Sequence, residues 1–525
     1  MPVQPPSSSG VYLEESPDDH HWIRPVDSST TAFVDFFARG PLDHPLVVDS
    51  YQEFVTAYGG LDARSEASYG IRQFFQHGGR RAVVLRVAPA EADRARAAML
   101  TLTDGHEPLL TVEAHTPGHW GNELQVGVEV GDSQGRFVLV VRQVARLRGE
   151  LRVVESEVHD DLSMDQDDPR YAPTTVTNSS ALVHLVDHLL EDGGADRPLP
   201  ELTAATVSDP ATLRDPGCPG FRALTGGSDG GRPSALDLAR GMPLLDHADE
   251  TIGIVCIPAM ANLDHGYGSV VGAALAYCRQ RRAFLLVDPP LTVTNSADMA
   301  AWVGRHGALR DPNAAFYFPP LQVEDPLAAG RPRVVAPSGV VAGVCSRLDG
   351  EEGVWKAPAG IEARVRGATP VTELLDADQD LLNPIAVNVI RTFPRVGTAV
   401  WGARTSVGLD GRVSEWRYVS VRRLALMVEE SLMQGLRWAV FEPNDETLWS
   451  RIRGDVEVFL HDLFREGAFV GATPREAFFV TCDRTTTTPG DISDGVVNLV
   501  VGVAPSKPSE FVVVRLRLRA GLSPR

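Results

Sequence analysis

Between residues 251 and 320 the sequence alternates short apolar segments with longer segments of helical periodicity. Strand, helix and strand in succession require crossover connections, which build a parallel sheet with helices on its faces. The predicted elements are, in order, the strand TIGIVCIP, a helix over 263–282, the strand AFLLVDPP, a helix over 295–307 and the strand AAFYFPPL. This repetition predicts an α/β fold for the middle of the chain.

The same alternation begins earlier, at Thr31. The predicted elements are the strand TTAFVDFFARG with its turn, the helix DSYQEFVTAYGG ending at Gly59, the helix SYGIRQFFQHGG ending at Gly78 and Gly79, and the buried strand RRAVVLRVA. Because the pattern is interrupted and then resumes, residues 28–94 and 221–384 are predicted to form one α/β middle domain. The interrupting segment, 95–220, reads as strands separated by turns, which predicts a β-rich insertion domain.

Residues 385–503 are predicted to form a further domain of mixed α+β type. Its helix pair comprises SVRRLALMVEESLMQGLRWAVFE and residues 445–466, with Asn444 as N-cap of the second helix and Gly467 as its end. Thr473 and Glu476 are spaced to form a capping box around Pro474. The segment GVVNLVVGVAP then predicts a strand.

Both ends of the chain are predicted to be arms. Residues 1–27 are an N-terminal arm and linker with the short strand signal GVYLEE, and 504–525 are a C-terminal linker and arm. In EFVVVRLRLR, arginines alternate with apolar residues, so one face of a strand would pack on a core and the other would meet water. Two partners are open for this strand: residues 495–503 of the same chain, through a six-residue loop, or another copy of the protein.

The composition limits the kinds of function and partner that this protein can have. The 525-residue chain is 43% hydrophobic and 22% charged, as in an ordinary globular protein, and its net charge of −20 argues against nucleic acid or an anionic membrane as partner. The five cysteines are scattered without metal or redox spacing, which indicates a reducing compartment. MPVQPPSSSG has no signal-peptide character, and no apolar run reaches the length of a membrane span. We therefore expect a soluble cytosolic protein without cofactors.

Several motifs resemble functional sites but lack a required element. LTGGSDGG has no P-loop Lys-Ser/Thr, and GYGSVVG carries Val271 where a dinucleotide fingerprint needs its third glycine. DADQD, at 376–380, begins like a calcium loop but cannot close it. His115 and His119 are separated by Pro117 and Gly118 and so share no helix face. Asp288, at the end of a predicted parallel strand, remains the one candidate acid or base of an α/β enzyme.

A set of segments in consistent order resembles a known family. They are GVYLEE with IRPVDSSTTAFVDFFARGP, HTPGHWGNEL, LTGGSDG, YFPPL, GVWKAPAG, NPIAVNVIRTFPRVGTAVWGART, SEWRYVSVRRLALMVEESL, FEPNDETLWSRIRGDVEVFLHDLFREGAFVG and SDGVVNLVVGVAPSKPSEFVVVRLRL. Together they resemble the sheath proteins of contractile tails, the family of phage tail sheaths and bacterial contractile injection systems. Residues 125–220 carry no matching segment.

The resemblance implies a structural protein and not an enzyme. Sheath subunits stack as hexameric rings around an inner tube, contract on a baseplate trigger and drive the tube through a target envelope. It implies that the C-terminal domain lies innermost, with a small sheet completed by arms of neighbouring subunits, and that the insertion lies outermost. The implied partners are further copies, the tube protein, and baseplate and terminator or cap proteins. The implied location is the bacterial cytoplasm during assembly and a released phage or phage-like particle afterwards.

The resemblance also assigns roles to residues of the arms. The N-terminal arm is Val11, Tyr12, Leu13, Glu14 and Glu15; the C-terminal arm is Phe511, Val512, Val513, Val514, Arg515, Leu516, Arg517, Leu518 and Arg519; the linker residues are Pro17, Pro25, Pro505 and Pro508. We further predict that the two arms lie in one sheet, with the glutamates and arginines on the same exposed face, where opposite charges fix the register. The alternative is that these charges are solvated ends that contribute little.

Two other function classes remain open on the sequence. The first is a cytosolic α/β enzyme that uses the sheet of 251–320 and Asp288, which predicts a discrete oligomer and a polar pocket at the strand ends. The second is a ring-forming shell protein that shares the arms but has a single helical state.

Overall fold

The computed structural model describes residues 21–89, 93–147, 149–188, 197–202, 207–407 and 415–507. The predicted N-terminal arm, most of the C-terminal linker and arm, Pro17 and Pro508 lie outside these residues. The described chain divides into two units, one of residues 21–26 with 424–507 and one of residues 27–423. This division falls between Arg423 and Leu424, 39 residues after the predicted boundary at 384.

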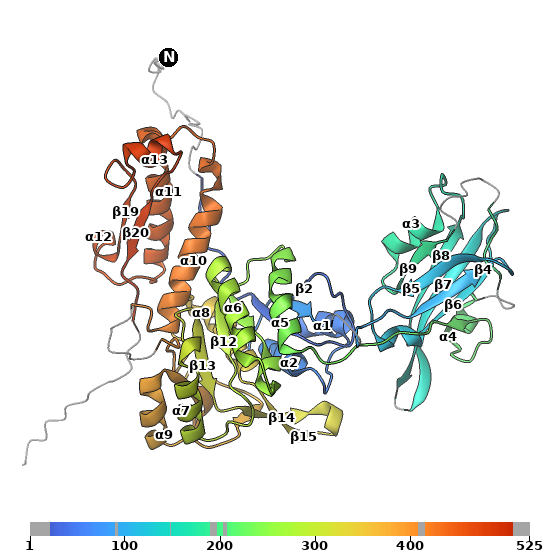
Figure 1. Cartoon of the computed structure of the whole chain (residues 1–525), viewed down its shortest axis with the longest axis horizontal. Coiled ribbons are helices and arrows are strands. Elements are labelled where there is room, and N and C mark those ends of the chain that lie inside the picture. Colours follow the sequence, from blue (N-terminus) through green and yellow to red (C-terminus); the bar gives the residue numbers. More distant parts are fainter. Residues whose placement is uncertain are drawn as a thin grey trace, which may run out of the picture. The chain divides into compact units, whose positions relative to one another are not determined.

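The larger unit is built on an eight-stranded sheet of order β18-β17-β13-β12-β11-β1-β3-β2. Figure 1 labels β2, β12 and β13 of this sheet. Its strands are β1 (Thr31–Asp35), β2 (Leu46–Val48), β3 (Ala82–Arg86), β11 (Ile254–Cys256), β12 (Phe284–Val287), β13 (Ala314–Phe318), β17 (Val387–Phe393) and β18 (Gly397–Val400). All pairings between β3 and β17 are parallel, and only the two edge strands are antiparallel. The predicted parallel sheet is confirmed. The sheet extends past residue 384 because β17 pairs with β13.

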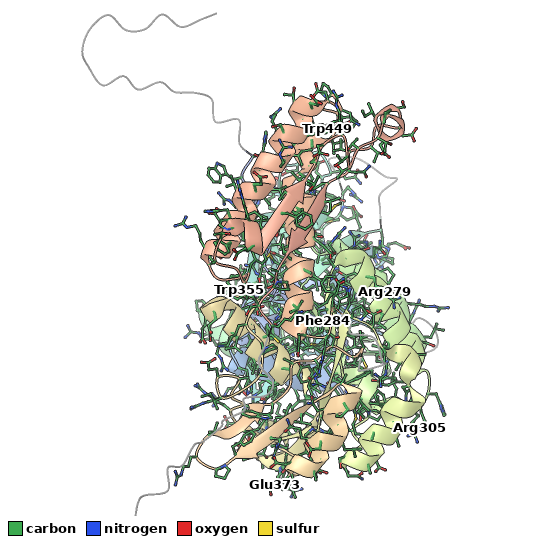
Figure 2. All side chains as sticks on the ribbon, turned by 90° about the vertical axis from the view of Figure 1, so that its left-hand side faces the viewer. Arg279, Phe284, Arg305, Trp355, Glu373 and Trp449 are labelled. Carbon is green, nitrogen blue, oxygen red and sulfur yellow. The ribbon has the colours of Figure 1, made fainter. Side chains whose placement is uncertain are left out.

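Helices cover both faces of this sheet, because successive residues of buried strands point to opposite sides. One face packs on α5 (Ala235–Gly241), α6 (Tyr267–Arg281) and α7 (Ser296–Arg305) in a single core cluster. The other face meets α2 (Glu66–Gln76) and α8 (Ser338–Glu352). Figure 2 shows Phe284 among the packed side chains and Arg279, Arg305 and Glu373 at the periphery. The larger unit is thus a three-layer α/β/α body.

Glycines let α2 and α8 approach each other closely. A Cβ on Gly339 would lie 2.3 Å from the carbonyl oxygen of Gly70, and one on Gly343 would lie 2.5 Å from that of Phe74. Any side chain at either α8 position would push the two helices apart. The remaining elements of the body are α1 (Tyr51–Tyr58), α9 (Asp376–Leu382) and a three-stranded sheet of β15 (Arg331–Val335), β14 (Leu321–Asp325) and β16 (Ala368–Pro370).

Residues 99–223 form two antiparallel sheets around a separate core cluster. One sheet is β4 (Met99–Thr103), β5 (Pro108–Ala114) and β9 (Val183–Asp187); the other is β10 (Arg222–Ala223), β6 (Leu124–Val130), β7 (Phe137–Leu147) and β8 (Glu150–Leu162). Two short helices accompany them, α3 (Ala172–Ser179) and α4 (Pro210–Arg214). The strand-rich character predicted for this segment is present.

The smaller unit contains α10 (Val419–Gly435), α11 (Glu446–Arg465), α12 (Pro474–Ala477), β19 (Phe478–Thr481), α13 (Pro489–Ser493) and β20 (Val500–Val503); α10 begins in the larger unit. The predicted helix pair and its end at Gly467 are confirmed. Two capping predictions are wrong. Asp445, not Asn444, caps α11 through Leu448 N, because Asn444 is engaged by Trp449 Nε1 and Val496 O. Thr473 and Pro474 occupy the predicted N-cap and N1 positions of α12, but the capping box is absent, since Thr473 makes no side-chain cap and Glu476 accepts from Ala472 N instead.

Candidate assembly surfaces

The two-stranded sheet β19–β20 has an open edge on each side among the described residues. Its register pairs Phe478 with Val503 and Thr481 with Val500. The ladder continues one step further, since Ala504 N donates to Ala477 O at 2.8 Å. Two short strands alone are marginal in water, and here α11 supports the pair by packing against β19. The open edges leave room for a further strand. The resemblance to sheath proteins implies a small sheet in this C-terminal domain, and β19–β20 is a small sheet there.

The register fixes which main-chain groups point outward. Hydrogen-bonded and non-hydrogen-bonded pairs alternate in an antiparallel ladder. Because Ala504 is bonded to Ala477, the pairs at Gly502 and Val500 are the bonded ones. Val501 and Val503 therefore direct their N–H and C=O groups to the outer edge of β20. An extended segment laid along that edge would find two donors and two acceptors.

The first residues of the C-terminal linker contact the smaller unit of their own chain. Pro505 forms a bridge with Phe469, and Val470 N donates to Ala504 O at 2.8 Å. The last described residue, Lys507, follows β20 by four positions, and 18 further residues follow it in the sequence. The anchoring of Pro505 leaves no signal in the sequence, because it depends on a contact with a residue 36 positions earlier.

The N-terminal linker is also anchored before it leaves the described chain. The His21 ring stacks on Trp438 with centroids 4.4 Å apart, and Val26 N donates to Ser431 Oγ at 3.0 Å. The Ile23 side chain packs against the backbone of Gly435, because a Cβ on Gly435 would lie only 2.8 Å from the Ile23 side chain. Pro25 thus lies in a segment that is held against the smaller unit on both sides, at His21 and at Val26.

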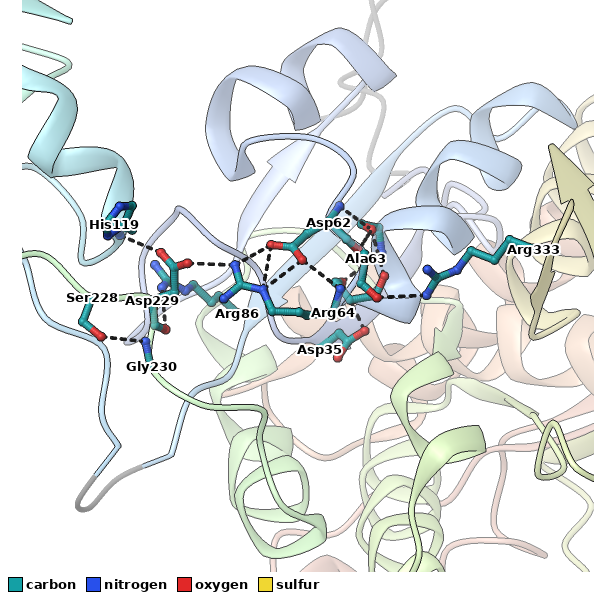
Figure 3. Close-up of polar contacts among 12 residues, drawn as sticks. Asp35, Asp62, Ala63, Arg64, Arg86, His119, Ser228, Asp229, Gly230 and Arg333 are labelled. Carbon is teal, nitrogen blue, oxygen red and sulfur yellow. Dashed lines mark hydrogen bonds and ion pairs between the residues drawn. The ribbon is translucent and has the colours of Figure 1, made fainter. Parts of the chain in front are cut away.

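A polar joint connects the α/β body to the 99–223 insertion (Figure 3). Asp229 accepts from His119 N at 2.6 Å and from Arg64 Nη2 at 2.7 Å, and Arg64 also binds Asp62. Arg86 is completely buried and donates to Pro117 O at 2.5 Å, to Gly40 O at 2.9 Å and to Asp229 O at 3.3 Å. Burial lowers the pKa of Arg86 to about 10, so it remains charged at neutral pH.

Asp229→Ala is expected to loosen this joint. The change removes one hydrogen bond to a main-chain N–H and one ion pair, a loss of about 1–2 kcal/mol. We expect faster proteolytic cleavage of the two connecting segments, near 93–98 and 224–232, with the melting of the α/β body little changed. Asp62→Ala is the matched control, because Asp62 binds the same arginine without contacting the insertion. Equal cleavage rates for both variants would contradict the role of Asp229.

Asp288 is a structural residue at the end of β12. Its side chain is only 1% exposed and accepts from Ser338 N at 2.9 Å and from the Ser338 hydroxyl, at the start of α8. Tyr267 donates to its carbonyl oxygen at 2.8 Å. The alternative role as a catalytic acid or base requires contact with a substrate, which this burial prevents.

Asp288→Asn is expected to flatten the pH dependence of stability. Burial raises the pKa of Asp288 from 3.8 to about 7, so between these values the folded chain keeps a proton that the unfolded chain has lost. Raising the pH through this window therefore destabilises the wild type, and asparagine removes that contribution. Between pH 5 and pH 7, the free energy of unfolding of the variant should rise by on the order of 2 kcal/mol relative to that of the wild type, as measured by urea unfolding. Parallel pH profiles would contradict this assignment.

The other motifs serve the fold. LTGGSDGG forms antiparallel bridges from Thr225 to Met99 and from Ser228 to Arg96, and it supplies Asp229 to the joint. GYGSVVG is the start of α6, where Tyr267 reaches Asp288. DADQD lies in α9, and Asp378 there accepts from Leu375 N and Ser296 Oγ. His115 precedes and His119 begins a short 3₁₀ helix, and no cluster of metal ligands occurs among the described residues.

Comparison with known proteins finds a family match for the C-terminal part of the chain. Residues 413–519 match the family model of the phage tail sheath C-terminal domain. The C-terminal region of this chain is therefore similar to the C-terminal domain of tail sheath proteins. The region includes β19, β20 and the arginine-rich end of the chain, so the open-edged sheet lies within the matched domain.

Relatives with sheath names match about a third of the chain. The tail sheath protein of Vibrio phage KVP40 is 26% identical over 187 residues, 35% of this chain and 26% of that protein. A protein of Pseudomonas aeruginosa strain UCBPP-PA14, named as a prophage major tail sheath protein, is 29% identical over 196 residues, 36% of this chain and 47% of that protein. The matches thus span about a quarter and just under half of these relatives.

Solved sheath structures share the whole fold. The sheath of the anti-feeding prophage in its contracted state matches with a TM-score of 0.54 at 22% identity, over 98% of this chain and 99% of that chain. The sheath tail protein of Listeria innocua matches with a TM-score of 0.60 at 13% identity, over 91% and 95%. The chain therefore has the mixed α/β, multi-sheet fold of sheath proteins. No helix among the described residues is long and apolar enough to span a membrane.

Proposed function

We propose that this protein is the structural subunit of a contractile sheath, which polymerises as stacked hexameric rings around an inner tube and contracts to drive the tube through a target envelope. One observation carries the proposal: a tail sheath C-terminal domain ends in a two-stranded sheet with open edges, directly followed by a strand-like sequence. The subunit uses binding surfaces and no active site.

Neighbouring subunits complete this sheet by strand donation. The C-terminal arm, Phe511–Arg519, and the N-terminal arm, Val11–Glu15, add to the edges of another copy's β19–β20 pair. Each ladder hydrogen bond contributes about 1 kcal/mol net, and the apolar side of the arm contributes further through burial. Because every subunit gives and receives arms around a closed ring, contacts of modest individual strength hold the lattice together.

The linkers let the lattice stay connected while subunits rearrange. The N-terminal linker is fixed from His21 onward by Trp438 and Ser431, and the C-terminal linker is fixed through Pro505. Movement on contraction is taken up by the segments around Pro17 and Pro508. The remaining partners are the tube protein, the baseplate and a terminator or cap, and assembly takes place in the bacterial cytoplasm before release in a phage or phage-like particle.

Electron microscopy of the purified full chain tests the proposed function. We expect long tubes with six subunits per ring, and two helical states of different length when the protein is assembled with and without its tube and baseplate. A single helical state under all conditions would identify a shell that does not contract. A discrete small oligomer would refute the sheath assignment.

A further inference from the structure

The outward face of β19–β20 carries an apolar patch at the open edge. Phe479 is 58% exposed and Val500 is 45% exposed, whereas their neighbours Phe478 and Val501 on the opposite face are partly covered. Exposed aromatic residues on a solvent face are costly for a monomer and typical of a binding surface. This patch is separate from the main-chain edge that pairs with a donated strand.

Gly502 lets the Phe479 ring extend toward the outer edge of β20. The two residues are direct cross-strand partners, and a Cβ on Gly502 would lie 2.1 Å from the Phe479 ring. The ring therefore lies across the backbone of Gly502, in the space that any side chain there would fill. Beyond Gly502 is the free edge formed by Val501 and Val503. A residue of an added strand opposite Gly502 would stand against this ring.

We propose that Phe479 and Gly502 form a platform that receives an arginine of the C-terminal arm of a second copy. The inference rests on the proposed function, since it concerns the strand that a neighbouring sheath subunit adds at this edge. A guanidinium over an aromatic face is a favourable cation–π contact, and arginine is the cation most often found there.

The alternation of the arm agrees with this arrangement. Val512, Val514, Leu516 and Leu518 share one face of the arm, and Arg515, Arg517 and Arg519 share the other. If the apolar face continues the covered side of the sheet, formed by Phe478, Val480, Val501 and Val503, the arginines stand on the side of Phe479. A shift of one residue would bury the arginines and expose the leucines, so the alternation allows only registers in which an arginine faces the platform.

A double-mutant cycle in the full chain tests the contact. The variants are Phe479→Leu, the triple change Arg515→Gln with Arg517→Gln and Arg519→Gln, and their combination. The measurement is the critical concentration for tube formation, by sedimentation and electron microscopy. We expect Phe479→Leu to raise the critical concentration about two- to fivefold in the wild-type background. In the background with the three arginine changes, Phe479→Leu should have almost no effect. Phe479→Tyr, which keeps the aromatic face, should assemble like wild type.

A control at Phe441 distinguishes this contact from a general loss of exposed apolar surface. Phe441→Leu removes another exposed aromatic side chain of the same unit, and its effect should be the same with and without the arm arginines. Additive effects of the Phe479 and arginine changes would overturn the proposal, while wild-type tubes would still support the proposed function. The same cycle is also measured by thermal unfolding of the unassembled chain. If the Phe479 and arginine changes are coupled there as strongly as in assembly, the arm binds β20 of its own chain, which would also overturn the proposal. A wild-type chain without tubes would refute the sheath function itself.

Discussion

A chain that ends at Lys507 is expected to fold but to form no tubes. The deletion removes the whole C-terminal arm and leaves every described element intact, including β20 and the anchor at Pro505. The outer edge of β20 offers two donors and two acceptors, at Val501 and Val503, so an added strand contributes about 4 kcal/mol through its ladder alone, at about 1 kcal/mol net per hydrogen bond. Its loss should raise the critical concentration for assembly more than about a hundredfold. We expect this deletion to impair assembly more than any single side-chain change in the same unit.

Circular dichroism and size-exclusion chromatography check the fold of the truncated chain, and electron microscopy checks its assembly. The matched control is a chain that ends at Arg519, which loses only the last six residues and keeps the predicted strand. This control should assemble like the full chain. Tubes of unchanged length and order from the chain ending at Lys507 would show that the joint between subunits lies elsewhere.

The largest effect on stability is expected from Asp349→Ala. Asp349 and Arg423 form a buried ion pair at 2.6 Å, with side chains 8% and 2% exposed, and Asp349 also accepts from Ser28 Oγ at 3.1 Å. Arg423 stays protonated at neutral pH, so removing Asp349 leaves a buried cation without its counter-ion. Breaking such a pair destabilises by about 3–5 kcal/mol. Urea unfolding of the arm-truncated chain, followed by tryptophan fluorescence, measures the shift without interference from polymerisation.

Glu446→Ala provides the control for this prediction. Glu446 pairs with Arg484 at 2.5 Å, but both side chains are largely exposed, so its loss should cost less than about 1 kcal/mol. The double change Asp349→Leu with Arg423→Met removes both charges and should recover part of the lost stability. A loss of similar size for Asp349→Ala and Glu446→Ala would contradict the role assigned to the buried pair.

The elements that could be predicted from the sequence are those with strong local signals. The buried strands β1, β3, β11, β12 and β13 and the helices between them follow from apolar runs and glycine stops, and the structure confirms them. The extent of the sheet could not be predicted, because NVIRTF and GTAV in β17 and β18 look like an ordinary hairpin. Only the parallel pairing of Val387 with Phe316 shows that they belong to the α/β body.

Capping and assembly residues depend on contacts between distant parts of the sequence. Asn444 has the right chemistry for a cap, but Trp449 and Val496 compete for its side chain. Asp229 and Arg86 form the joint although they are 143 residues apart. Gly502 reads as one glycine in a valine-rich strand, and only the register with Phe479 explains it. The arm strand differs from these residues, because the alternation in LRLR that predicts it is local.

The connection of the insertion has a consequence for how such subunits diversify. The chain enters the insertion near Arg96 and Met99 and leaves it near Thr225 and Ser228, and these four residues pair with one another. Entry and exit therefore form one short antiparallel ribbon, and Arg86 donates to the carbonyl oxygens of Asp229 and Pro117 beside it. A module attached through a single paired stem can be exchanged for one of another size, or removed, without altering the register of the eight-stranded sheet. The surface that the insertion carries can thus change while the sheet that supports it stays the same.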